Sequence, residues 1–423
     1  MARVLLLLPT RTYRAHDFME AARRLGLEVT VGSESRQAFT SLFPGGHLQL
    51  DFLRPRQAVR TIAAFARSYP LDAVVAVDDD GMLPAAAAAK ALGLPHNPVT
   101  AVAATRNKHR LRRKVAAAGL PSPRFERLSV EDDPVRAPPR MPFPCVLKPL
   151  HLAASRGVMR ADDADQFVAA FERLAAILRT PDVVQRGGRL ARYVLVEGFI
   201  PGAEVALEGL LVGGELTVLA VFDKPDPLDG PFFEETLYVT PSRLPDGALA
   251  DVAAQTAKAA AAIGLREGPV HAEWRVNEHG AWLIDMAARS IGGLCSRVLQ
   301  FGTGMSLEEL ILLHAGGVDV ATYKRESAAA GVMMLPIPRR GVLRAVDGQE
   351  AARCVPGIVG LAITIALGQE VVPLPEGVQY LGFLFARGDT PEGVEASLRN
   401  GHQCLSFTIE PKRMAQPPFF VSQ

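Results

Sequence analysis

The first hundred residues alternate between short apolar runs and segments with helical periodicity. Val4–Leu8 is a compact apolar run that predicts a buried strand, and Ala15–Leu25 has the periodicity of a helix that stops at Gly26. The alternation continues in a strand at Leu27–Val31, a helix at Arg56–Ser68, a strand at Ala73–Val77 and a helix at Pro84–Leu92. Strands that alternate with helices predict a parallel sheet with helices on both faces.

The middle of the chain mixes helices with strands joined by tight turns. Gly213-Gly214 between two apolar runs is the strongest hairpin signal, and Glu131–Pro144, rich in proline and charge, indicates a loop or boundary. The predicted strands here are Cys145–Lys148, Tyr193–Val196, Val205–Val212, Glu215–Val221, Val270–Val276 and Trp282–Met286. The predicted helices are Lys108–Ala118, Asp165–Arg179, Asp246–Ile263 and Leu307–Ala315. From Gly331 onward, short strands separated by Pro and Gly predict a mostly β subdomain.

Composition narrows the class of protein. The 423 residues suggest about three domains. With 46 Lys and Arg against 45 Asp and Glu, the net charge of +1 argues against a nucleic-acid or membrane-surface binder. Four widely spaced cysteines without a CxxC motif imply neither a zinc site nor a disulfide framework. No apolar run reaches the ~18 residues of a membrane helix, and the first residues do not form a signal peptide, so we expect a cytoplasmic protein.

An acidic run follows one of the predicted strands. Asp78-Asp79-Asp80-Gly81 comes directly after Ala73–Val77. Open parallel sheets bind ligands at the carboxyl ends of their strands, so this run is a candidate ligand-binding edge. A solvated acidic turn is an equally good interpretation.

Two other strand ends carry candidate nucleotide-binding groups. Lys148 ends a buried strand, where a lysine needs a charged partner, and the small residues of His151–Gly157 could close around a phosphate. Later, Tyr193–Val196 runs into Glu197, and a Pro-Gly turn follows before Glu204. The free backbone groups beside Glu197 suit an adenine edge, and Glu204 suits ribose hydroxyls. A surface lysine with an ordinary loop, and a plain strand corner, are the simpler alternatives.

A second predicted hairpin, formed by Val270–Val276 and Trp282–Met286, gives the sharpest hypothesis. If its turn is centred on His279, Glu273 lies directly opposite Asp285 on the neighbouring strand. Facing carboxylates repel unless a cation lies between them, and Mg²⁺ is the natural oxygen-seeking ion. Arg289 follows four residues after Asp285 and suits a bidentate grip on a carboxylate or phosphate. A structural Asp285–Arg289 ion pair is the alternative.

Five segments, taken together and in this order along the chain, are diagnostic: Leu92–Pro95; Asn107–Arg113 with Gly119–Pro123; Pro144–Pro149; Val196–Glu204; and His271–Glu273 with Leu283–Arg289. Together they resemble the ATP-grasp superfamily of carboxylate–amine ligases over about residues 1–315. His271–Glu273 with Ala287–Gly293, and also Phe232–Pro245, are similar to its L-amino-acid ligase (dipeptide synthetase) branch. Residues 329–423 resemble the C-terminal domain of that branch, which is related to the carboxyl-terminal part of biotin carboxylases.

The resemblance implies a role for individual residues. Lys108 and Lys148 would hold ATP phosphates, with Ser155 in the phosphate loop. The adenine and ribose would be bound by Glu197, Phe199, Ile200 and Glu204. Glu273 and Asp285 would ligate Mg²⁺, or Mn²⁺ in its place, and Glu273 and Arg289 would be catalytic. The amino-acid or acyl-phosphate site would be faced by Glu235, His271, Arg289 and Gly292. Two features depart from the family pattern: Asp285 stands where Glu is usual, and His151–Gly157 holds a single glycine.

The implied architecture combines α/β and α+β parts in an ATP-grasp fold. We expect a Rossmann-like domain at 1–105, linker helices and a small lid subdomain at 106–196, a catalytic subdomain at 197–328 and a β-rich subdomain at 329–423. The implied reaction joins amino acids through an acyl phosphate and releases ADP and phosphate, with a homodimer possible by analogy. Two alternatives are a bicarbonate-dependent or purine-precursor ligase of the same superfamily, and a non-catalytic ATP-binding protein.

Overall fold

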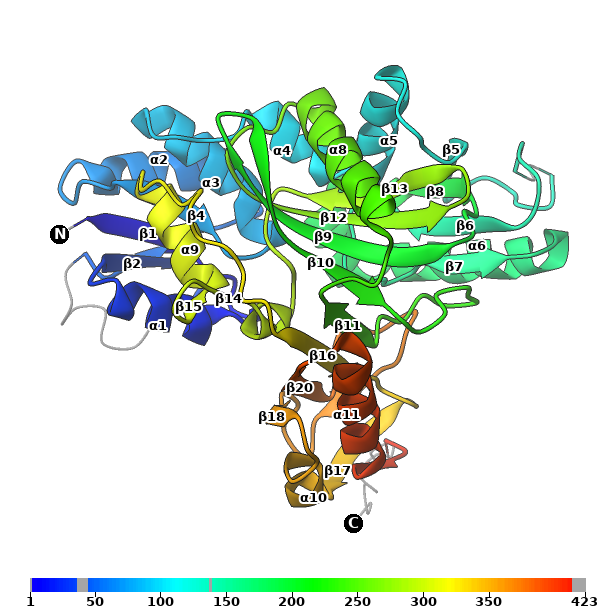
Figure 1. The fold of residues 1–423 in the computed structure, drawn as a ribbon. Helices are drawn as coiled ribbons and strands as arrows, with labels where there is room; N and C mark the ends of the chain where they lie inside the picture. Colours follow the sequence, from blue (N-terminus) through cyan, green and yellow to red (C-terminus); the bar gives the residue numbers. More distant parts are fainter. Residues whose placement is uncertain (1, 36–44, 137–138, 413–423) are drawn as a thin grey trace, which may run out of the picture.

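A computed structural model describes residues 2–35, 45–136 and 139–412. Figure 1 shows four parts that follow one another along the chain: an N-terminal domain, a lid, a large central sheet and a C-terminal part that projects from this sheet.

The N-terminal domain is the parallel α/β unit that the sequence predicts. Its sheet has the order β3-β2-β1-β4, and all three strand pairs are parallel. Its strands are β1 (Arg3–Leu7), β2 (Glu28–Ser33), β3 (His47–Gln49) and β4 (Ala73–Ala76), and its helices are α1 (Ala15–Arg24), α2 (Pro55–Ala66) and α3 (Asp79–Leu92). Helix α3 begins at Asp79 rather than at the predicted Pro84, because Asp79 and Asp80 favour the positive end of a helix.

Helices α4 (Val99–Thr105) and α5 (Lys108–Ala117) lead into the lid, which we define as residues 125–198. Its antiparallel sheet has the order β5-β8-β6-β7. The lid strands are β5 (Phe125–Ser129), β6 (Cys145–Pro149), β7 (Met159–Ala161) and β8 (Tyr193–Gly198), with helices α6 (Ala164–Leu178), α7 (Pro181–Gly187) and the 3-10 helix η2 (Gly188–Arg192). Apolar residues of α6, among them Phe167 and Leu174, pack on this sheet to form a separate small core.

An antiparallel sheet of eight strands forms the centre of the molecule, in the order β13-β12-β9-β10-β11-β16-β20-β18. Its first five strands are β9 (Ala203–Val212), β10 (Glu215–Lys224), β11 (Leu237–Thr240), β12 (Gly268–Asn277) and β13 (Gly280–Ala287). Helix α8 (Asp246–Ile263) packs on one face around the buried Trp274. Strand β16 (Ala329–Leu335) pairs with β11 and β20, so the sheet runs across residue 329, where we expected a subdomain to begin.

The C-terminal part extends the central sheet and adds a second one. Strands β18 (Ile358–Ile363) and β20 (Gly382–Gly388) complete the large sheet, and a small sheet has the order β19-β17-β21. The small sheet contains β17 (Gly341–Asp347), β19 (Glu370–Val371) and β21 (Ser406–Glu410), and the helices are α10 (Gln349–Arg353) and α11 (Pro391–Gln403). Val394 and Leu398 of α11 pack against the large sheet in one apolar core.

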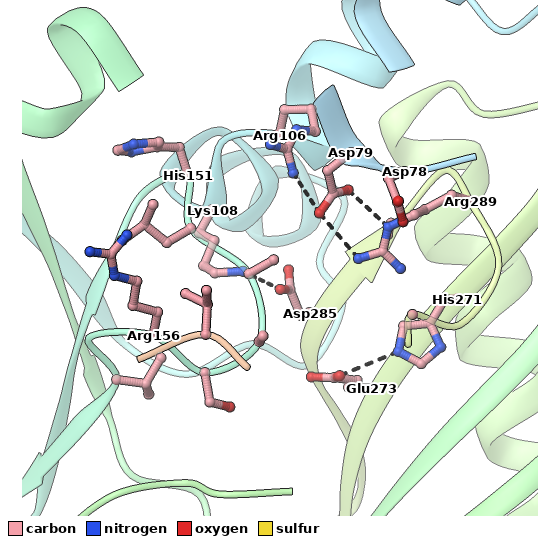
Figure 2. Close-up of a pocket in the computed structure, with 18 of the residues that line it drawn as sticks. Asp78, Asp79, Arg106, Lys108, His151, Arg156, His271, Glu273, Asp285 and Arg289 are labelled. Carbon is pink, nitrogen blue, oxygen red and sulfur yellow. Dashed lines mark hydrogen bonds and ion pairs between the residues drawn. The ribbon is translucent and has the colours of Figure 1, made fainter. Parts of the chain in front are cut away.

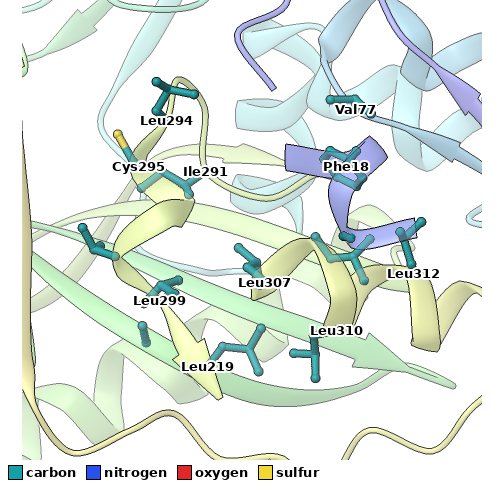
Figure 3. Packing of buried hydrophobic residues seen from close by; sticks show 14 of the residues in the cluster. Phe18, Val77, Leu219, Ile291, Leu294, Cys295, Leu299, Leu307, Leu310 and Leu312 are labelled. Atoms are coloured by element: carbon teal, nitrogen blue, oxygen red, sulfur yellow. The ribbon is translucent and has the colours of Figure 1, made fainter. Parts of the chain in front are cut away.

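Helix α9 (Leu307–Ala315) packs between the N-terminal domain and the central sheet. Figure 3 shows Leu307, Leu310 and Leu312 of α9 between Phe18 of α1 and Leu219 of β10. The segment before α9 contains the 3-10 helix η3 (Cys295–Val298) and the short strands β14 (Gln300–Phe301) and β15 (Met305–Ser306). This packing fixes how the two halves of the cavity described below face each other. Among the described residues, no helix combines the length and apolar character needed to cross a membrane.

Candidate active site

One large cavity of about 660 Å³ lies where the N-terminal domain, the lid and the central sheet meet. All thirteen residues singled out in the sequence line it: Lys108, Lys148, Ser155, Glu197, Phe199, Ile200, Glu204, Glu235, His271, Glu273, Asp285, Arg289 and Gly292. They come from segments spread over more than 180 positions of the chain. Figure 2 shows how several of these side chains turn toward a common space.

Lys148 is held at the end of β6 by a buried carboxylate. Its ammonium group lies 2.7 Å from Glu197 Oε2, and Arg112 of α5 donates to both oxygens of the same carboxylate, at 2.5 and 3.1 Å. Burial raises the pKa of Glu197, but Arg112 and Lys148 outweigh it and lower the pKa to about 2. The Glu197 carboxylate therefore fixes the position of Lys148 at the cavity.

Glu273 and Asp285 occupy opposing positions, as predicted, but the turn differs from the prediction. The two strands pair from Asn277 and Gly280 onward, so the turn is not centred on His279, and the register shifts by one residue at Ile284. This β-bulge places Asp285 opposite Glu273.

Asp285 has a cationic partner from a distant helix. Lys108, at the first turn of α5, donates a hydrogen bond to the Asp285 carboxylate (Figure 2). The alternative Asp285–Arg289 pair is therefore wrong. Glu273 and Asp285 together present hard carboxylate oxygens on neighbouring strands, and this donor set fits a divalent cation.

A buried histidine fixes the orientation of Glu273. His271 bonds through Nδ1 to Glu208 of β9 and lies 3.3 Å through Nε2 from Glu273 Oε1. Burial alone would lower the pKa of His271, but the Glu208 carboxylate raises it to about 9. His271 is consequently protonated near neutral pH and does not serve as a general base there.

Lys224, a lysine that the sequence analysis did not single out, lies among three carboxylates. Its ammonium group is 2.8 Å from Glu204, 2.6 Å from Glu235 and 3.5 Å from Glu273. Burial alone would lower the pKa of Lys224, but these carboxylates raise it well above its usual value. Carboxylate oxygens of Glu204, Glu235 and Glu273 lie within 4.8 Å of one another. Lys224 offsets part of their charge, and Arg275 and His271 contact Glu204 and Glu273.

Arg289 forms an ion pair with Asp79, in the acidic run that follows β4. Its guanidinium donates two hydrogen bonds to Asp79, at 2.9 and 3.1 Å, and Arg106 contacts the same carboxylate at 2.9 Å. Burial raises the pKa of Asp79, but Arg106 and Arg289 outweigh it and hold the pKa below its usual value. The alternative interpretation of the acidic run as a solvated turn is therefore wrong for Asp79. Asp80 instead pairs with Arg186 of the lid at 2.6 Å.

The loop predicted to bind phosphate has a strained backbone. Ala154 and Ser155 both have positive φ, 53° and 51°, which is unfavourable for residues other than glycine. Such strain costs about 1–3 kcal/mol per residue and concentrates at functional sites. The loop is anchored at its start, where Leu150 accepts a hydrogen bond from the backbone N–H of Lys108 at 2.9 Å.

Four side chains that organise the cavity were not singled out in the sequence: Arg106, Arg112, Glu208 and Lys224. For Lys224 a signal existed, because Lys224-Pro225 at the end of β10 repeats the Lys148-Pro149 pattern in a chain with only eight lysines. The other three lie in a helix terminus, a basic helix and an apolar strand, where such residues are common.

Family models and known proteins match this chain along most of its length. An ATP-grasp N-terminal domain matches residues 19–96, an ATP-grasp domain 141–298, and an L-amino acid ligase C-terminal domain 333–410. The alanine–anticapsin ligase of Bacillus subtilis is 27% identical over 284 residues, which cover 64% of this chain and 58% of that protein. A D-alanine–D-alanine ligase of Aromatoleum aromaticum is 30% identical over 223 residues, covering 48% of this chain and 68% of that protein.

Among solved structures, an L-amino acid ligase from Bacillus licheniformis superimposes with a TM-score of 0.79 at 23% identity, covering 97% of this chain and 99% of that one. The fold is therefore the ATP-grasp fold that the sequence motifs indicated, and this fold implies binding of ATP with a divalent metal. The chain belongs to the ATP-grasp superfamily. Its C-terminal domain is of the L-amino acid ligase type.

Proposed function

We propose that this protein is an ATP-dependent ligase that joins the carboxylate of one amino acid to the amine of another through an acyl phosphate, releasing ADP and phosphate. The observation that carries the proposal is the convergence on one cavity of two lysines, facing carboxylates and a clamped arginine. The names of the relatives and the type of the C-terminal domain support amino acids as substrates.

The lid side of the cavity would bind the nucleotide. Lys148, fixed by Glu197, and Lys108 would hold the phosphates, and the strained loop would place Ser155 beside them. Phe199 and Ile200 follow β8 and line the cavity, where they would enclose the adenine. Glu204 would accept from the ribose hydroxyls, and Lys224 and Arg275 hold its carboxylate in place at 2.8 and 2.7 Å.

Phosphoryl transfer brings two anions together, a carboxylate and a triphosphate. Lys108 and Lys148 lower the repulsion between them, and Glu273 and Asp285 would hold Mg²⁺. Bound Mg²⁺ would supply further charge neutralisation at the transferred phosphoryl group. His271, protonated and held by Glu208, keeps Glu273 in place rather than moving protons.

Arg289 would bind the acyl phosphate and the phosphate that leaves it. Its bidentate contact with Asp79 and a hydrogen bond of 2.9 Å from Nη1 to the Ser290 carbonyl fix the plane of the guanidinium, and the second N–H of each Nη atom would bind phosphate. Glu235 and Gly292 also line the cavity, where they would contact an amino acid. Because acyl phosphates hydrolyse in water, the lid must cover this space during the reaction.

A phosphate-release screen tests the proposal. The protein is incubated with ATP, Mg²⁺ and amino acids, singly and in pairs, in bicarbonate-free buffer. The proposal predicts that some pairs release phosphate and yield an equal amount of a peptide. Phosphate release that requires bicarbonate would instead indicate a carboxylase of the same superfamily. If ATP binds and no amino acid or other carboxylate promotes its turnover, the protein is a non-catalytic ATP-binding protein.

A further inference from the structure

A segment of the C-terminal part reaches back to the phosphate loop. Residues 372–380, which we name the strap, connect β19 to β20. The carbonyl of Pro375 in the strap accepts a hydrogen bond of 2.9 Å from the backbone N–H of Gly157, the last residue of the phosphate loop. A Cβ on Gly157 would lie 2.8 Å from Leu174, so the loop packs closely on helix α6 of the lid at this point. The strap thus touches the very loop proposed to bind ATP phosphates.

A second contact joins the strap to the main lid helix. Arg173 of α6 donates two hydrogen bonds to the Glu376 carboxylate, at 2.7 and 3.0 Å. The same guanidinium lies over the ring of Phe232, 5.0 Å from its centre. Both partners are about two-fifths exposed, so the pair by itself is an ordinary surface ion pair of small effect. Its bidentate geometry and the neighbouring backbone contact make the attachment specific.

The strap also lines the cavity itself. Its turn is tight, because Gly377 donates to the Pro373 carbonyl at 2.8 Å and a Cβ on Gly377 would lie 1.8 Å from the Val372 oxygen. Beyond this turn, Val378 and Tyr380 line the cavity. Tyr380 is buried and packs edge-on against Phe383, with ring centres 6.0 Å apart. One short, constrained segment therefore contacts both the phosphate loop and the cavity wall.

We infer that the strap holds the lid over the cavity and that Glu376 is a positioning residue for ATP, an inference that rests on the proposed ATP-binding role of the loop. The Arg173–Glu376 pair and the Gly157–Pro375 hydrogen bond both join the lid to the C-terminal part, so they form together only when the two are in contact. They bias the lid toward the covered arrangement, in which the phosphate loop faces ATP and water is kept from the acyl phosphate.

A charge reversal with a compensating partner tests this inference. Glu376→Arg places two guanidinium groups against each other. We expect the affinity for ATP, measured by calorimetry, to fall at least five-fold, and the phosphate released per amide formed to rise at least two-fold. The double variant Arg173→Glu/Glu376→Arg restores an opposite-charge pair and should return both quantities to within about three-fold of the starting protein.

A matched control separates positioning from general stability. Arg344 and Glu410 form a similarly exposed pair at 2.9 Å on the small C-terminal sheet, away from the lid. Glu410→Arg should leave ATP affinity and the phosphate-to-amide ratio unchanged. The inference is overturned if Glu376→Arg matches the control in both readouts, or if the double variant restores neither. Should no amide form at all, the proposed ligase activity fails, and the ATP affinities alone decide the role of the strap.

Discussion

Lys108 of α5 and Asp285 of β13 form an ion pair at the cavity, although 177 positions separate them in the chain. Asp285 therefore has a cation of the protein beside it as well as Glu273 opposite it. Glu273 in turn is neutralised by Lys224 and His271. The negative charges of the two facing carboxylates are therefore compensated by cations of the protein. A neutral substitution of Asp285 would remove the partner of Lys108 rather than relieve a repulsion.

Asp285→Asn should cost stability modestly and activity severely. The amide leaves Lys108 without its carboxylate, and because this lysine is partly exposed, we expect a loss of about 1 kcal/mol. Turnover should fall by about a hundred-fold or more, because an amide is a poor ligand for Mg²⁺. Melting temperature and initial rate of phosphate release measure the two effects.

Asp285→Glu is the matched comparison, since it keeps the charge and lengthens the side chain by one methylene. It should retain turnover within about ten-fold. If the Asn variant turned over at the normal rate, Asp285 would have no part in metal binding.

Lys148 and Arg112 share the Glu197 carboxylate but should respond differently to replacement. In Lys148→Met, Glu197 keeps both hydrogen bonds from Arg112, so stability should change little while ATP affinity falls about ten-fold or more. In Arg112→Met, a buried carboxylate loses its bidentate partner, and unfolding should become easier by about 3 kcal/mol. Chemical denaturation and nucleotide calorimetry on both variants compare these effects. Equal ATP affinities in the Lys148→Met and unmodified proteins would remove Lys148 from the nucleotide site.

Asp79 should control catalysis through Arg289. Asp79→Asn keeps the shape but weakens the grip on Arg289 and Arg106, so the guanidinium is no longer fixed in the cavity. We expect kcat to fall about ten- to a hundred-fold while the KM for ATP stays within two-fold. Steady-state kinetics with ATP varied checks this split. A rise in KM for ATP at constant kcat would place Asp79 and Arg289 in nucleotide binding instead.

His151 should make the protein sensitive to mild acid. Burial, together with the charge of Arg106, lowers the pKa of His151 to about 4 from its usual 6.5. The pKa of His151 is lower in the folded state than in the unfolded state. The free energy of unfolding is therefore undiminished by this group above pH 6.5 and decreases as the pH falls toward 4. His151→Asn cannot take up this proton, so its unfolding free energy should decline less steeply over that interval, by about 1–3 kcal/mol. Identical pH profiles for the two proteins would show that His151 is not buried as a neutral group.

Local sequence signals predicted much of the fold and the position of the facing carboxylates. The alternating apolar pattern gave the parallel N-terminal sheet, and one hairpin contains both Glu273 and Asp285. The bulge at Ile284 was not predictable, because it depends on how β13 fits beside β12 rather than on turn residues. The predicted pairing is correct, while the predicted turn position is not.

The ion-pair partners of the charged residues could not be predicted, because they come from segments that are far apart in the sequence. Arg112 and Glu197 are 85 positions apart, Glu208 and His271 are 63 apart, and Asp79 and Arg289 are 210 apart. Each pair forms only after sheets and helices from different parts of the chain have packed together. Pattern and spacing identify which residues are unusual, and tertiary structure decides which of them meet.

Transfer of oxygen from the substrate carboxylate tests the proposed reaction most directly. An amino acid labelled with ¹⁸O in its carboxylate is incubated with ATP, Mg²⁺ and a second amino acid, and the products are examined by mass spectrometry. If the carboxylate attacks the γ-phosphorus and the amine then expels phosphate, each phosphate carries one ¹⁸O and the peptide bond retains the other. Unlabelled phosphate, or label in AMP released with pyrophosphate, would contradict the acyl-phosphate ligase.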